Sequence, residues 1–156
     1  MGLFDRLRGG EPKADPMGRF PAWYHAMEGR VGDLVRGLDQ GVGVDHADQK
    51  GVTLLSIASF YGRTDAVRLL LERGADPNLV NNRGNGPLWE ATRGASMNPS
   101  ADGAGFDPEI VRMLLAAGAD PSHANAAGTK PALWAQHSPE LQAIYRAAGY
   151  QGEFNE

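Results

Sequence analysis

Two short motifs recur along this chain at matching intervals, and their recurrence constrains the fold more than any other feature. The tetrapeptide Gly-Ala-Asp-Pro occurs at 74–77 and again at 118–121, and Gly41 lies 33 residues before its first copy. The glycines of a second series are separated by 33 and then 44 residues: Gly51, Gly84 and Gly128. Both series therefore share one period of 33 residues and one insertion of 11, which indicates stacked structural repeats.

Each period contains two short helical patterns separated by turns. After Gly51, Leu55 and Ala58 lie three residues apart on one helical face, and Gly62 predicts the end of that helix. A broader apolar pattern follows at 66–71, and patterns of the same kind recur in the neighbouring periods. No segment shows the sustained alternation of β-branched residues that is typical of strands. The chain is therefore predicted to be all-α and built from helix pairs.

These residues resemble the ankyrin-repeat family, whose unit opens with Gly-x-Thr-Pro-Leu-His-x-Ala and closes with Leu-Leu-x-x-Gly-Ala-Asp-x-Asn. The unit at about 46–78 carries the resemblance through Gly51, Thr53, Leu55, Ala58, Gly62, Val67, Leu70, Leu71, Gly74, Ala75, Asp76 and Asn78. The next unit carries it through Gly84, Pro87, Leu88, Ala91, Val111, Leu114, Leu115, Gly118, Ala119 and Asp120. The resemblance implies an ankyrin-repeat solenoid of about four units over 21–149, with degenerate terminal caps, an N-terminal extension at 1–20 and a tail at 150–156.

The chain departs from the family pattern at the turn histidine, which is replaced by Ser56, Trp89 and Leu133. We therefore expect the polar bracing between units to be thinner than in the family, with bulky side chains compensating. Trp89 and Trp134 are interpreted as fillers between units rather than as contacts for a ligand.

Composition limits both the core and the class of function. Leu, Ile, Val and Phe together make about a fifth of the chain, whereas Ala occurs 22 times and Gly 21 times, so the core must pack small side chains closely. The formal net charge of −4 disfavours electrostatically driven binding to nucleic acid, and no apolar run is long enough for membrane insertion. Because cysteine is absent, we expect a reducing, cytoplasmic setting.

The titratable residues do not form a recognisable catalytic or metal-binding pattern. His46 and His123 occupy equivalent positions two units apart, which places them on the order of 16–20 Å from each other, too far to share a metal. His25 and His137 have no histidine four residues away. The chain also lacks a phosphate-binding glycine loop and a Gly-x-Ser-x-Gly nucleophile motif. We therefore expect no enzymatic activity, no cofactor and no metal.

A stack of such repeats presents a concave surface made by the turn tips and the first helices. The family pattern, carried over to this chain, implies partner-binding positions at Gln49, Lys50, Val52, Phe60, Tyr61, Asn82, Arg83, Asn85, Glu90 and Arg93. Two adjacent aromatic residues cannot both face one helix seam, so at least one of Phe60 and Tyr61 is expected to point outward. The alternative is that one ring fills a gap beneath the turn at 62–64.

The insertion lies near 95–106, between the two helices of the third unit. Its Gly, Pro, Ser, Ala and Asp content predicts a loop, in which Met97 and Phe106 are candidate apolar anchors for a partner. A tolerated surface insertion, with Phe106 folded back on the helices, is the alternative.

These observations predict a non-catalytic module that binds another protein. A small, acidic, cysteine-free repeat protein resembles immunity proteins that bind and neutralise a bacterial toxin or effector enzyme, and the 12 Arg, 3 Lys and 22 Ala fit a GC-rich bacterial genome. The alternative function is a regulatory adaptor that links two cellular proteins. In that case the apolar residues Leu3, Phe4 and Leu7 would supply a second contact.

Overall fold

The computed structural model describes residues 13–97 and 107–155. Within these ranges the chain forms seven α-helices and one 3-10 helix: α1 Pro21–Glu28, α2 Val31–Asp39, α3 Leu54–Phe60, α4 Thr64–Glu72, α5 Pro87–Met97, α6 Glu109–Ala116, η2 Pro131–Ala135 and α7 Pro139–Ala147. Strand-like pairing in the described residues is limited to an isolated bridge between Ala47 and Thr53. The predicted all-α solenoid is confirmed, with four helix pairs.

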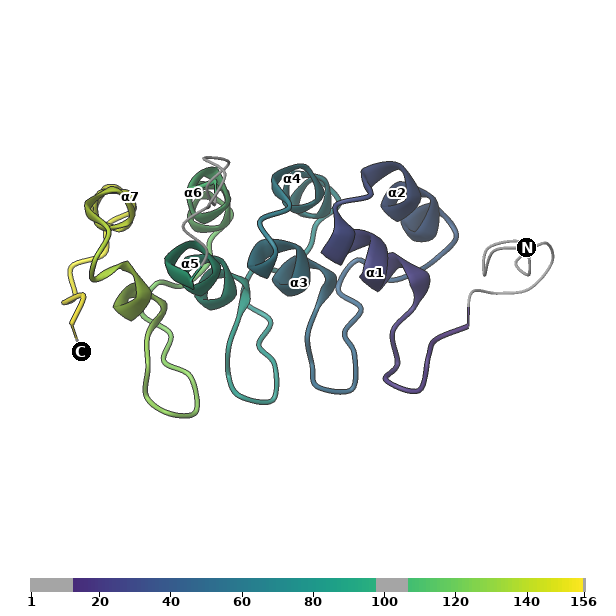
Figure 1. Ribbon diagram of the computed structural model, residues 1–156, viewed down its shortest axis with the longest axis horizontal. Coiled ribbons are helices and arrows are strands. Elements are labelled where there is room, and N and C mark those ends of the chain that lie inside the picture. Colours follow the sequence, from purple (N-terminus) through teal and green to yellow (C-terminus); the bar gives the residue numbers. More distant parts are fainter. Residues whose placement is uncertain (1–12, 98–106, 156) are drawn as a thin grey trace.

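The helix pairs stack side by side into two rows (Figure 1). One row contains α1, α3, α5 and η2, which we call the inner helices, and the other contains the outer helices α2, α4, α6 and α7. Hairpin-like loops project from the row of inner helices. We call their hydrogen-bonded tips fingers 1 to 4, at 15–19, 48–52, 81–85 and 125–129.

The helices begin at residues suited to a helix start, although they are too short to be stable without packing. The Thr53 hydroxyl accepts the backbone N–H of Ser56 at the start of α3, and the Ser138 hydroxyl accepts that of Leu141 at the start of α7. Proline opens α1, η2 and α7, where its missing N–H costs no helical hydrogen bond.

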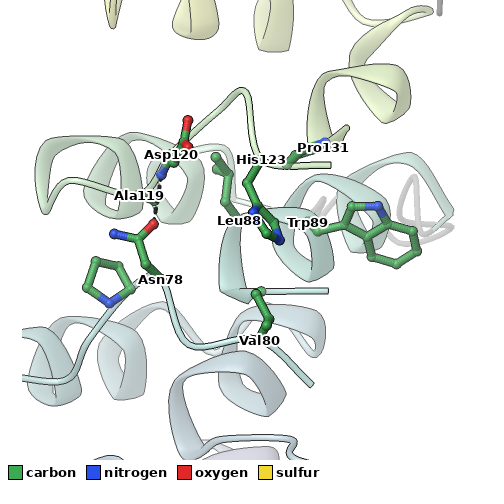
Figure 2. A pocket seen from close by; sticks show the side chains of 10 residues that line it. Asn78, Val80, Leu88, Trp89, Ala119, Asp120, His123 and Pro131 are labelled. Carbon is green, nitrogen blue, oxygen red and sulfur yellow. Dashed lines mark hydrogen bonds between the residues drawn. The ribbon is translucent and has the colours of Figure 1, made fainter. Parts of the chain in front are cut away.

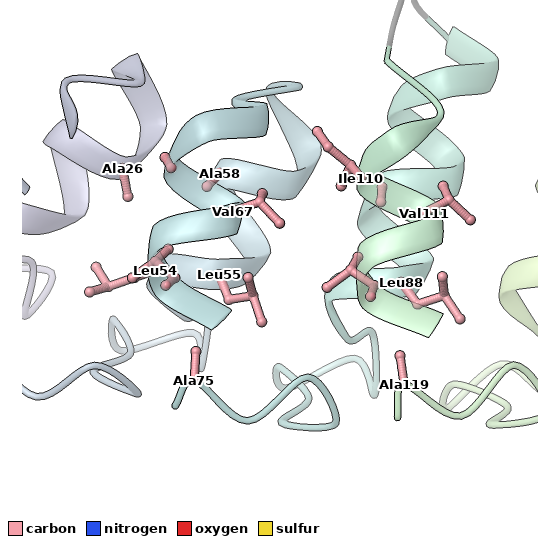
Figure 3. Close-up of a cluster of buried hydrophobic side chains, with 14 of the residues drawn as sticks. Ala26, Leu54, Leu55, Ala58, Val67, Ala75, Leu88, Ile110, Val111 and Ala119 are labelled. Atoms are coloured by element: carbon pink, nitrogen blue, oxygen red, sulfur yellow. The ribbon is translucent and has the colours of Figure 1, made fainter. Parts of the chain in front are cut away.

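The core runs between the two rows and uses equivalent positions of successive units (Figure 3). The buried positions on the outer helices are Leu34, Val67, Val111 and Ile144, and those on the inner helices are Ala22, Leu55, Leu88 and Ala132. In the first unit Ala22 faces Gly37, where a Cβ atom would lie 3.0 Å from the Ala22 Cβ. The second unit has Leu55 and Leu70 at these positions. The expected close packing of small residues is therefore found mainly toward the ends of the stack.

The ordered repeats extend beyond the range of 21–149 given by the sequence. Finger 1 begins at Asp15, so residues 15–19 belong to the repeat series rather than to an extension. At the other end, Tyr150 and Phe154 are buried, and their rings lie 5.7 and 6.0 Å from that of Tyr145. The tail therefore covers the last helix pair.

The expected loop at 95–106 begins later than the sequence indicates. α5 continues through Met97, so 95–97 are helical. The Ser96 hydroxyl donates a hydrogen bond to the carbonyl of Trp134, which ties this last turn to the next unit. Phe106 and the apolar residues Leu3, Phe4 and Leu7 lie outside the described residues.

Candidate functional site

The four fingers share one hydrogen-bonded geometry. At the first position of each finger, a side-chain oxygen accepts the backbone N–H groups two and four residues ahead. The residues at this position are Asp15, Asp48, Asn81 and Asn125. The fourth position is a glycine in the left-handed region, with φ between +75° and +78°. The turn is therefore maintained by the main chain and one side chain, and the second and third finger positions are not needed for it.

Neighbouring fingers are also joined by main-chain hydrogen bonds. The N–H groups of Gln49, Asn82 and Ala126 donate to carbonyls of the preceding fingers, each at 2.9 Å. The approach is so close that a Cβ atom on Gly84 would lie 2.9 Å from the Ala126 nitrogen. The fingers therefore supply polar bracing between units that does not depend on the replaced histidine.

The two equivalent histidines contribute to the same bracing. The Nε2 atom of His46 lies 2.7 Å from the Gly18 carbonyl oxygen, and that of His123 lies 3.1 Å from the Gly84 carbonyl oxygen. Each histidine thus contacts the finger of the preceding unit. Among the residues that the structure describes, no three His, Asp or Glu side chains converge in a geometry that could hold a metal ion.

The predicted finger residues differ in their exposure. Gln49, Lys50, Asn82 and Arg83 are exposed at the second and third finger positions. Val52 is half-buried, and its carbonyl accepts the indole N–H of Trp23 at 3.2 Å.

Asn85 was expected on the binding surface, but it does not reach it. Its side chain is only 5% exposed, and its Oδ1 atom accepts a hydrogen bond from Asn125 Nδ2 at 2.8 Å. Asn85 therefore links fingers 3 and 4, because the last position of each finger turns toward the next unit.

The aromatic pair at the end of α3 divides as predicted, with one ring outward. Tyr61 is 47% exposed, whereas Phe60 is half-buried, and the two rings meet edge to face with centroids 5.1 Å apart. The Arg93 guanidinium of the next inner helix lies 5.1 Å from the Phe60 centroid. Phe60 and Tyr61 thus form a partly exposed aromatic step between two units, bordered by a cation.

Glu90 and Arg93 lie on the same side of α5. Arg93 Nη1 is 3.4 Å from Glu90 Oε2, and its guanidinium also lies 5.5 Å from the Trp89 ring. Burial raises the pKa of Glu90, although Arg93 and Asn85 act in the opposite direction. The Glu90 carboxylate therefore gains less from its neighbours than it loses by leaving water.

Trp89 and Trp134 pack against each other across the third and fourth units. Their rings meet edge to face at 5.5 Å and 87°. This arrangement agrees with their interpretation as fillers between units. Met97, the last residue of α5, is 56% exposed.

Trp89 also lines a small pocket between the loops that follow α4 and α6 (Figure 2). Asn78 and Asp120 close one side, where the Asp120 N–H donates to Asn78 Oδ1 at 2.9 Å. Val80 lies farther along the loop after α4 and His123 farther along the loop after α6, and both line the pocket. Its volume of about 260 Å³ is below the range that usually accommodates small-molecule ligands, so we assign it no ligand.

A cluster in the first unit was missed by the sequence analysis. Arg19 Nε lies 3.3 Å from the buried carboxylate of Asp48, and its guanidinium stacks 4.5 Å above Trp23. Tyr24 donates to Asp15 at 2.6 Å, and this bond lowers the pKa of Asp15. The 33-residue spacing of Gly18 and Asp15 from Gly51 and Asp48 indicates this first finger.

Comparisons with known proteins agree with this geometry. The family model described as ankyrin repeats in three copies matches residues 22–125. An ankyrin repeat-containing protein, P1E11.10, from Schizosaccharomyces pombe is 34% identical over 67 residues, which are 43% of this chain and 32% of the yeast protein. Ankyrin repeat domain-containing protein 63 is 41% identical over 70 residues in mouse (44% of this chain, 17% of the relative) and over 58 in human (36% and 15%). The chain therefore spans about a third or less of the length of these relatives.

Proposed function

This chain belongs to the ankyrin-repeat family, whose repeats form protein–protein interaction modules, and from that premise we propose that its fingers and inner helices bind one partner protein. We call this surface the finger face. The residues that we propose to contact the partner are Gln49, Lys50, Val52, Phe60, Tyr61, Asn82, Arg83, Glu90, Arg93 and Met97.

The aromatic step at the end of α3 carries this proposal. Tyr61 exposes about half of its side chain, and Phe60 lies against the guanidinium of Arg93. Tyrosine and arginine are the residue types most often responsible for affinity at protein interfaces, and they contribute most where surrounding contacts exclude water. A partner that covers the step would bury both rings together with the Arg93 side chain.

The specific function that we propose is inhibition, in which the partner is a bacterial toxin or effector enzyme whose active site the finger face covers. This version rests on the composition of the chain, which is small, acidic and free of cysteine. Such an inhibitor acts by occlusion and needs no catalytic group of its own. The lack of cysteine supports action in the cytoplasm.

One observation supports the alternative function, a regulatory adaptor. A groove of about 540 Å³ lies between the outer helices α6 and α7, away from the inner helices, and small side chains such as Ala116, Ala143 and Ala147 line it. An adaptor needs two separate contact surfaces, and this groove would be the second.

No helix in the described ranges has the length and apolar character of a membrane span.

A tagged pull-down from the native cell, analysed by mass spectrometry, tests both functions. The wild-type chain is run beside the double variant Phe60→Ala, Tyr61→Ala, with Arg36→Glu, Arg68→Glu on the outer helices as the matched control. We expect a stoichiometric enzyme that the control retains and the aromatic variant loses, and whose activity falls when the wild-type chain is added.

Two other outcomes would change the assignment. Recovery of two different proteins, of which only one depends on Phe60 and Tyr61, would replace the inhibitor by the adaptor. Partners that are indifferent to the aromatic variant would contradict binding by the finger face, provided that circular dichroism shows the variant to be folded.

A further inference from the structure

The basic side chains of this protein fall into two groups that differ in their pairing. Five arginines on the outer helices or at their ends form ion pairs: Arg30, Arg36, Arg68, Arg73 and Arg112. Two others, Arg63 and Arg146, instead donate to the carbonyls of Met27 and Tyr150. Lys50 and Arg83 on the fingers are exposed, and neither forms an ion pair with any residue that the structure describes. The fingers thus present exposed positive charge although the net charge of the chain is −4.

The acidic residues close to the fingers are already engaged. Asp48 is buried and paired with Arg19, and Glu90 is half-buried and paired with Arg93. Asp15 accepts the Tyr24 hydroxyl and two backbone N–H groups of its own finger. Asp15 and Asp48 are therefore occupied by other partners, and Glu90, which also interacts electrostatically with Arg83, is shared with Arg93.

The positions of the two exposed cations are fixed relative to each other. Lys50 and Arg83 occupy the same position of fingers 2 and 3, and the Asn82 N–H donates to the Lys50 carbonyl at 2.9 Å. Neighbouring helices pack about 8–10 Å apart, so equivalent side chains of adjacent units start at about that spacing. A polypeptide in the extended polyproline II conformation has three residues per turn and rises about 3.1 Å per residue, so side chains three residues apart lie on one face, about 9 Å from each other. Three residues of a partner chain in this conformation therefore match one step along the fingers.

Resting on the proposed function, we propose that the partner presents to the fingers an extended segment with two acidic side chains three residues apart. One carboxylate pairs with Lys50 and the other with Arg83. The side-chain amides at the second finger positions donate to the preceding finger, Gln49 to the Pro16 carbonyl and Asn82 to the Gln49 carbonyl, so the charged side chains are the ones that face the segment. The cations steer the segment and fix its register, and the aromatic step of Phe60 and Tyr61 supplies apolar contact.

Selection from a library of random dodecapeptides displayed on phage tests this inference. The wild-type chain, the double variant Lys50→Glu, Arg83→Glu and the control Arg36→Glu, Arg68→Glu are used as baits. Both double variants lower the net charge by the same amount, so that they differ only in where the charge is reversed. Circular dichroism first establishes that all three baits are folded.

We expect the wild type and the control to enrich peptides with Asp or Glu at positions i and i+3, and the finger variant to lose this preference. A selected peptide, titrated by fluorescence anisotropy, should bind the finger variant at least tenfold more weakly than the wild type. Its affinity for the wild type should fall when NaCl is raised from 50 to 300 mM.

The contradicting outcomes separate this inference from the proposed function. Peptides without acidic pairs that still require Phe60 and Tyr61 would overturn the acidic segment and leave the finger face as the binding surface. Acidic peptides that bind the finger variant as well as the wild type would overturn the roles of Lys50 and Arg83. A selection in which no peptide is enriched over an albumin bait would overturn the acidic segment, whereas the finger face itself is contradicted only by the pull-down with the aromatic variant.

Discussion

The fingers and the outer helices use their side chains in opposite ways. In the fingers, main-chain hydrogen bonds and a single Asp or Asn maintain the turn, and Lys50 and Arg83 project without an ion-pair partner in the described residues. In the outer helices, buried side chains such as Val67 and Leu70 hold the unit, and exposed arginines pair with acids three residues away. The exposed finger positions can therefore change for recognition with little effect on the fold, whereas the buried positions of the outer helices cannot change without losing stability.

The largest expected effect is at an outer-helix position in the core. Leu70→Ala removes a side chain with no exposed surface and should lower the free energy of unfolding by about 3 kcal/mol, through lost burial and the resulting cavity. Urea denaturation followed by circular dichroism measures this change. Leu79→Ala, in the partly exposed loop ahead of finger 3, is the control and should cost less than about 1 kcal/mol. Equal losses at both positions would remove the contrast between the two regions.

A smaller effect is expected from a finger side chain that maintains the turn. Asn81→Ala removes the acceptor for the backbone N–H groups of Arg83 and Asn85, and should cost about 1–2 kcal/mol. Arg83→Ala, two residues away, should stay within about 0.5 kcal/mol of the wild type. The same denaturation experiment compares them. A loss at Arg83 as large as that at Asn81 would show that the projecting side chains also support the fold.

The smallest effect is expected at Glu90, where the informative result is whether Glu90→Gln raises or lowers the free energy of unfolding. Because burial raises the pKa of Glu90 in the folded state, ionisation of Glu90 disfavours folding. The stability contributed by the protonated carboxyl group is fully present below the pKa of Glu in the unfolded chain, and it is lost as pH rises through the pKa of Glu90 in the folded state. Glu90→Gln should therefore be more stable than the wild type at pH 7, by about 0.5 kcal/mol, with the difference vanishing near pH 3.5. Thermal melts at both pH values measure this. A less stable variant at pH 7 would mean that the pair with Arg93 outweighs burial.

The fold could be predicted from the sequence wherever the repeat is regular. The glycine spacing and the apolar positions Leu55, Ala58, Val67 and Leu70 suffice for α3 and α4, because each residue has the same environment in every unit. Finger 1 was missed, although Gly18 extends the 33-residue series, because few of its other residues match the family pattern. The first unit deviates at the core as well, where Ala22 and Gly37 stand in place of Leu55 and Leu70.

The candidate site could be predicted in outline but not in detail. The exposure of Gln49, Lys50, Asn82 and Arg83 follows from their place in the repeat. The burial of Asn85 does not, since it depends on Asn125 in a unit 40 residues away. The pairing of each arginine likewise depends on which acid lies within reach after folding. Sequence position therefore indicates the surface, and the contacts between units determine which side chains remain available.

Isothermal titration calorimetry with the captured partner tests most directly whether the finger face is the binding surface. We predict that Phe60→Ala, Tyr61→Ala weakens binding by about 2 kcal/mol or more, roughly 30-fold in Kd, because the variant removes the aromatic step and the ring beneath Arg93. The outer-helix control Arg36→Glu, Arg68→Glu should bind within about twofold of the wild type. An unchanged Kd for the folded aromatic variant, together with lost binding in the outer-helix control, would contradict the account and place the partner on the outer helices.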